Sequence, residues 1–200
     1  MTWWLKVRTA PGLLAALGGT MLLGLLIGDA ELPVPALTGQ SGRFLLGHLL
    51  TLTPAVVFLF GTGRGDTASE SVAIRPVRRW DVALALTTAA LALAAAGVVH
   101  TLAPDSIALT LGRNTTGYLG LALLLYPFLG HRLAGAAICA VPLICAGAGW
   151  AQGGQPEPWA WILYPPNSAP ALTAALTILA TGTIAALTWQ RQPWNPQAAR

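Results

Sequence analysis

The chain has 200 residues, of which 54% are hydrophobic and only 9% are charged. Soluble globular domains carry about 25% charged residues, so this composition excludes a water-soluble globular protein and predicts an integral membrane protein. The formal net charge of +4 does not indicate nucleic-acid binding, because the eleven Lys and Arg residues sit in short segments between apolar runs.

Six apolar segments follow one another along the chain. A helix needs about 20 residues to cross a hydrocarbon core of ~30 Å. In order, the segments cover residues 12–28, 44–61, 82–102, 117–129, 133–150 and 171–189, and the fourth is short unless it starts near Ser106. The sequence therefore predicts an all-α fold. This is a polytopic membrane helical bundle of six transmembrane helices that forms a single membrane domain over residues 1–200.

The distribution of positive charge predicts the orientation. Alternate connections contain nine and two Lys or Arg residues, and the two are Arg43 and Arg113. The side with more positive charge faces the cytoplasm, which places both termini inside. The tryptophans fall at the predicted ends of the spans, as expected for indole rings at a membrane–water interface. The predicted location is the cell membrane, with the lipid bilayer as the first partner.

Rows of small residues at four-residue spacing occur in three of the segments. Such rows let helices approach closely in lipid, and hydroxyls can then bond across the contact. A polar transport path is the alternative interpretation of the same rows. The rows are Gly24 and Gly28; Gly47, Thr51 and Ala55; and Thr173, Thr177 and Thr181.

The titratable residues do not form a catalytic constellation. His48 and His100 lie toward the outer ends of their segments without a carboxylate or cysteine partner nearby in the sequence. Hydrogen bonding across helices, or exposure to water, is therefore the favoured role, with metal binding or proton relay as the alternative. The glycine-rich stretch 61–67 lacks the Gly-Lys-Ser/Thr that would hold a nucleotide phosphate. We expect no enzyme activity, metal or cofactor, and no ATP hydrolysis by this chain alone.

Two connections have the composition of interaction segments. The cytoplasmic one contains Glu70, Arg75, Pro76, Arg78 and Arg79. It could bind a partner with an acidic groove, or it could contact anionic lipid as a positive-inside anchor. The outer one, between the fifth and sixth spans, carries four large aromatic residues and is predicted to lie in the outer interface. They are Trp150, Trp159, Trp161 and Tyr164.

These features together resemble the membrane (permease) subunits of ABC-2-type exporters of high-GC bacteria. The resemblance rests on six spans with both ends inside, the outer aromatic segment, and Glu70 followed by Pro76-Val77-Arg78-Arg79. It implies that the cytoplasmic segment forms a coupling helix against a separate ATPase subunit, with Glu70, Arg75, Pro76, Arg78 and Arg79 as docking residues. It also implies a homo- or hetero-oligomer. The alternative function is a non-transporting membrane accessory, such as an immunity or scaffold protein that binds a partner through the outer aromatic loop.

Overall fold

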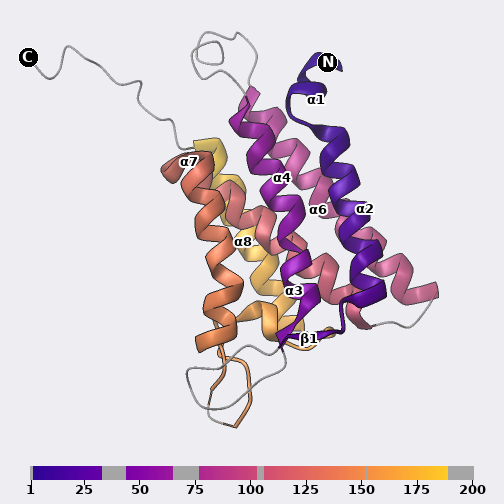
Figure 1. Cartoon of the computed structure of the whole chain (residues 1–200). Helices are drawn as coiled ribbons and strands as arrows, with labels where there is room; N and C mark the ends of the chain where they lie inside the picture. Colours follow the sequence, from indigo (N-terminus) through magenta and orange to yellow (C-terminus); the bar gives the residue numbers. More distant parts are fainter. Residues whose placement is uncertain (1, 33–43, 65–76, 103–105, 152, 189–200) are drawn as a thin grey trace, which may run out of the picture.

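The computed structural model describes residues 2–32, 44–64, 77–102, 106–151 and 153–188 (Figure 1). This part of the chain is mostly helical and contains five helices long and apolar enough to cross a membrane. The prediction of an all-α protein built from membrane-length apolar helices is confirmed to that extent.

The first third of the chain forms two long helical segments with a pair of two-residue strands between them. Helix α1 (Thr2–Val7) is followed by α2 (Ala10–Ile27). Strand β1 (Glu31–Leu32) pairs antiparallel with β2 (Phe44–Leu45), with Leu32 opposite Phe44. Helices α3 (Leu46–Leu50) and α4 (Leu52–Gly63) then follow directly and together form one membrane-length segment.

The remaining elements are α6 (Val77–Leu102), α7 (Ser106–Ala148), the 3-10 turn η1 (Trp161–Leu163) and α8 (Ala169–Thr188). Helix α7 is broken at Gly130, whose φ of 76° and ψ of 172° lie in a region that is essentially restricted to glycine. The chain reverses at this break, so the two halves of α7 run in opposite directions (Figure 1). The break falls between the fourth and fifth predicted spans.

Helix α7 is the centre of the bundle, and α2, α4, α6 and α8 all pack against it. The contact with α8 is a backbone contact, because a methyl group placed on Gly182 would overlap the carbonyl oxygen of Gly120. The packing face of α8 is formed by small buried residues: Ala171, Ala175, Gly182 and Ala186. Small residues at a helix interface let backbones approach closely in lipid, which gives van der Waals contact over a long length.

The threonine row predicted on α8 is on the wrong face for packing. Thr173, Thr177 and Thr181 are exposed, and their hydroxyls donate to carbonyls of their own helix instead of to a neighbouring helix. The alanine and glycine positions have the same helical spacing, so spacing alone did not distinguish the two faces. By contrast, Gly24 does face the bundle, against Leu111 of α7.

Different elements lie at the two ends of the bundle. Helix α1, the end of α4, the start of α6 and the last turn of α8 lie at one end (Figure 1). His131, just after the break in α7, is at this end too, because it is the side chain nearest to Gly63. The strand pair, η1 and the 149–168 connection lie at the other end (Figure 1). Below, these are called the α1 end and the η1 end.

Candidate functional site

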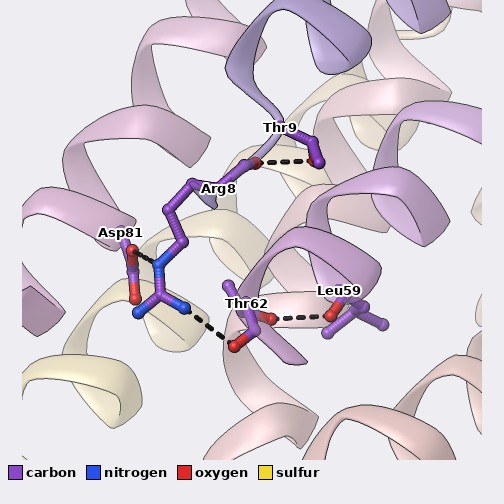
Figure 2. A network of polar contacts seen from close by, with 5 residues as sticks. All are labelled: Arg8, Thr9, Leu59, Thr62 and Asp81. Carbon is purple, nitrogen blue, oxygen red and sulfur yellow. Dashed lines mark hydrogen bonds and ion pairs between the residues drawn. The ribbon is translucent and has the colours of Figure 1, made fainter. Parts of the chain in front are cut away.

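At the α1 end, the side chain of Arg8 joins two other helices (Figure 2). Its Nε donates to Oδ1 of Asp81 on α6 at 2.8 Å, and its Nη1 donates to the carbonyl oxygen of Thr62 on α4 at 2.8 Å. The side chains of Arg8 and Asp81 are only 2% and 12% exposed. A buried ion pair is tolerated only where geometry and further hydrogen bonds offset the cost of desolvation. We refer to Arg8, Thr62 and Asp81 as the Arg8 clamp.

The backbone around Arg8 is shaped to place its side chain in the bundle. Thr9 adopts a left-handed conformation with a φ of 53°, which turns the chain between α1 and α2. Its hydroxyl donates to the carbonyl of Arg8 at 2.7 Å, and the Thr62 hydroxyl donates to the carbonyl of Leu59 at 2.8 Å (Figure 2). Gly61 lies against the Arg8 carbonyl so closely that a methyl group on Gly61 would overlap it. The connection therefore contacts α4 backbone to backbone.

Only two of the five predicted docking residues, Arg78 and Arg79, are among the residues that the structure describes. Glu70, Arg75 and Pro76 lie outside the described residues. Arg78 is half-buried and Arg79 is exposed, both in the first turn of α6. Trp80, the next residue, is 42% exposed and its ring centroid lies 6.1 Å from that of Trp4.

At the η1 end, Arg113 holds the 149–168 connection from within the bundle. Arg113 lies two turns inside α7 and is 2% exposed. Its Nη1 donates to the carbonyl of Pro165 at 2.8 Å, its Nη2 to the carbonyl of Tyr164 at 3.0 Å, and its Nε to Oδ1 of Asn114 at 3.2 Å. Asn114 itself is fully buried, and its amide donates to the carbonyl of Ile162 at 3.4 Å. The prediction that Arg113 belongs to an outer connection was therefore wrong. Arg113 lies in α7, and its side chain binds backbone carbonyls of the 149–168 connection.

The four aromatic residues of this connection do not form one exposed surface. Trp150 and Trp161 are 7% and 5% exposed, Tyr164 is half-buried, and Trp159 is 49% exposed. The Trp161 ring packs edge-on against Tyr118 of α7, with 5.5 Å between ring centroids. Trp161 fits there because Gly117 has no side chain, and a methyl group at Gly117 would overlap the indole. Two of the four aromatic side chains of the connection, those of Trp150 and Trp161, are thus buried in the bundle.

A cavity of about 530 Å³ lies at the η1 end between the connection and the helices. Its wall includes His48, Thr110, Asp29 and Tyr164. His48 is 4% exposed, and its Nδ1 accepts the backbone N–H of Leu45 at 3.2 Å. The imidazole therefore satisfies a donor at the start of α3. This contact is local and the side chain is buried, so His48 has neither the bond across helices nor the exposure to water that the sequence favoured.

Two hydroxyls on α7 lie deeper in the bundle beside Arg113. Thr115 and Tyr118 are both fully buried, and their hydroxyl oxygens have no hydrogen-bond partner among the residues the structure describes. Most buried polar atoms in proteins are hydrogen-bonded, so these two are exceptions. The stretch of α7 from Arg113 to Tyr118 is consequently a concentration of buried polar side chains.

Other candidates from the sequence are dispersed. Cys139 is exposed and Cys145 is buried, and neither is in a disulfide. Within the described ranges, no group of three or more His, Cys, Asp and Glu side chains is arranged to hold a metal ion. The Arg8 clamp and the contacts of Arg113 with the connection were not found from the sequence, since the partners lie 51 to 73 residues away. No protein family model matches the chain, and no curated protein or solved structure matches it significantly.

Proposed function

We propose that this chain is the membrane-spanning, permease-like component of an ABC-2-type export system in the cell membrane, driven by a separate cytoplasmic ATPase. In this proposal the protein has six spans, because α7 contributes two, one on each side of Gly130. The α1 end faces the cytoplasm and both termini lie there. The protein works as a homo- or hetero-oligomer.

The orientation is supported by where the charged residues lie. Lys6, Arg64, Arg79 and Arg132 belong to elements whose ends meet at the α1 end. The η1 end has the acidic residue Asp29 just before β1, Glu31 in β1 and Glu157 in the connection. Positive charge near the ends of spans is enriched on the cytoplasmic side, so this separation favours a cytoplasmic α1 end.

The observation that carries the proposal is the Arg8 clamp. Segment 65–76, which includes three of the predicted docking residues, begins just after α4 and ends just before α6. Arg8 binds Thr62 on one side of this segment and Asp81 on the other. A displacement imposed on the segment by an ATPase would therefore act on α2, α4 and α6 together. Such a mechanical connection is what a coupling segment requires.

The cavity at the η1 end is consistent with a route through the bundle. It has a polar wall with His48 and Thr110, and the unpartnered hydroxyls of Thr115 and Tyr118 lie further along α7. Polar groups inside a membrane bundle are costly and commonly mark a substrate path. In the proposal, the Trp161 ring, which packs edge-on against Tyr118, must move when substrate passes along this route.

The burial of the aromatic residues weighs against the accessory function. Partner binding through the outer loop would use its large rings, and Trp150 and Trp161 are turned into the bundle. Only Trp159 presents a largely exposed indole. The accessory function is nevertheless a distinct outcome of the experiment that follows.

The test is affinity purification of the tagged chain in mild detergent, with identification of the proteins that co-purify. We expect a stoichiometric ATPase that is lost when Arg75, Arg78 and Arg79 are changed to Glu. Lys6→Glu is the control, because Lys6 is an exposed cation at the α1 end that lies outside the docking segment. Retention of the ATPase by the triple variant would refute the docking role. Recovery of a non-ATPase membrane partner alone would support the accessory function instead.

A further inference from the structure

A second cavity opens between α6 and α8, with α7 as its floor. Its volume is about 450 Å³, within the range of roughly 300–1,000 Å³ that is typical of ligand pockets. One part of the wall is apolar and contains Leu93 of α6, Leu109 of α7 and Leu172 and Leu176 of α8. The other part is polar, with Arg113 and Ser168. We call this cavity the α6–α8 groove.

The polar part of the groove contains a positive charge that no carboxylate neutralises within the described chain. All three hydrogen-bond partners of Arg113 are neutral oxygens, two from backbone carbonyls and one from an amide. A guanidinium has five N–H donors, so two remain after these bonds. Buried charges in proteins are normally paired or bound to an ion, which makes an anion the missing partner. Arg113 is 2% exposed, so that anion must enter the groove to reach it.

The apolar part of the groove determines what carries the anion. Leu172 and Leu176 are 38% and 42% exposed on the surface of a membrane-length helix, so the groove is bordered by side chains that face lipid. The leucines at 93 and 109 continue the apolar wall toward α7. An anion with a hydrocarbon chain attached would fill both parts at once, whereas a small inorganic anion would leave the leucines uncovered.

We propose that the α6–α8 groove binds one anionic membrane lipid, with its phosphate at Arg113 and an acyl chain along the leucines of α6 and α8. The lipid phosphate supplies acceptors for the two remaining guanidinium donors, in an environment where charge-assisted hydrogen bonds are strong. Ser168 lies at the start of α8, at the positive end of the helix dipole, which further favours an anion there. This site does not depend on the export proposal.

The test is native mass spectrometry of the full chain in detergent with equimolar phosphatidylglycerol and phosphatidylcholine of the same acyl chains. We expect one phosphatidylglycerol to be retained, with an apparent Kd about tenfold below that of phosphatidylcholine, because phosphatidylcholine carries a choline cation beside its phosphate and is neutral overall, which offsets its attraction to the guanidinium. Leu172→Trp should fill the apolar part and abolish the retention. Leu187→Trp is the matched control, because Leu187 is a 47% exposed leucine of α8 that does not line the groove.

The headgroup contact is tested separately by Arg113→Gln. This variant should retain phosphatidylglycerol and phosphatidylcholine about equally. Arg113 also holds the 149–168 connection, so Arg113→Gln can prevent folding. In that case the result from Leu172→Trp is the deciding test of the proposal. Equal retention of the two lipids by the wild-type chain, or unchanged retention by Leu172→Trp, would overturn the proposal. Inorganic phosphate is the third probe, and displacement of the lipid at equal concentrations would show a site for a free anion instead of a lipid.

Discussion

The Arg8 clamp makes a quantitative prediction about stability. Arg8→Leu removes the guanidinium from Asp81 and the donor from the Thr62 carbonyl, both in a region where the two charged side chains are at most 12% exposed. Removing one partner of a buried ion pair costs about 3–5 kcal/mol, because the other charge stays in a poorly solvated position. The double variant Arg8→Leu/Asp81→Leu removes both charges, so we expect its free energy of unfolding to return to within about 1 kcal/mol of the wild type.

The assay is equilibrium unfolding in mixed micelles with increasing SDS, followed by circular dichroism, for the wild type, the two single variants and the double variant. Lys6→Leu is the control, because Lys6 is exposed on the neighbouring turn and its replacement should change stability by less than about 0.5 kcal/mol. The reasoning is refuted if the effects of the two single changes simply add in the double variant, since additivity would mean that the two side chains are not coupled.

Two further predictions concern α7 and its contacts. Gly182→Ala should destabilise the protein by about 1–3 kcal/mol, because the new methyl group meets the backbone of Gly120 and cannot be accommodated by a side-chain movement. Gly97→Ala has open space around it and should be neutral or stabilising in the same unfolding assay; equal losses in both variants would contradict this account. Arg113→Gln should raise amide hydrogen exchange in residues 160–164 about tenfold or more, since each lost bond to the guanidinium contributes about 1.5–3 kcal/mol. Unchanged exchange there would mean that Arg113 does not anchor the connection.

The helical membrane class could be predicted from the sequence because a long apolar run leaves few alternatives. A segment of about 20 apolar residues must satisfy its own backbone hydrogen bonds in lipid, and a helix does so locally. The break in α7 also has a local signal. Gly130 is followed by His131 and Arg132, so an apolar run ends at the one residue whose backbone can adopt the required conformation.

The interior contacts could not be predicted, because their partners are distant in the sequence and are often backbone atoms. Arg113 looks like any positively charged residue near the end of a span until the carbonyls of Tyr164 and Pro165 are placed beside it. Similarly, Arg8 and Asp81 are 73 residues apart, and each has an ordinary interpretation alone as a charge at the end of a helix. Burial, which distinguishes these residues from surface charges, follows only from how the helices pack.

The way Arg113 holds the 149–168 connection has a consequence for its tolerance of insertions and deletions. The guanidinium contacts main-chain carbonyls at 164 and 165, so many side chains could occupy those positions without loss of the bonds. One added or deleted residue, however, would shift the carbonyls by up to ~3.5 Å along the chain and move them out of hydrogen-bond range. The turn at Gly153 and Gly154 is exposed and can absorb such changes. Chain length in this connection is therefore constrained after Ala160 and less constrained at the exposed turn of Gly153 and Gly154.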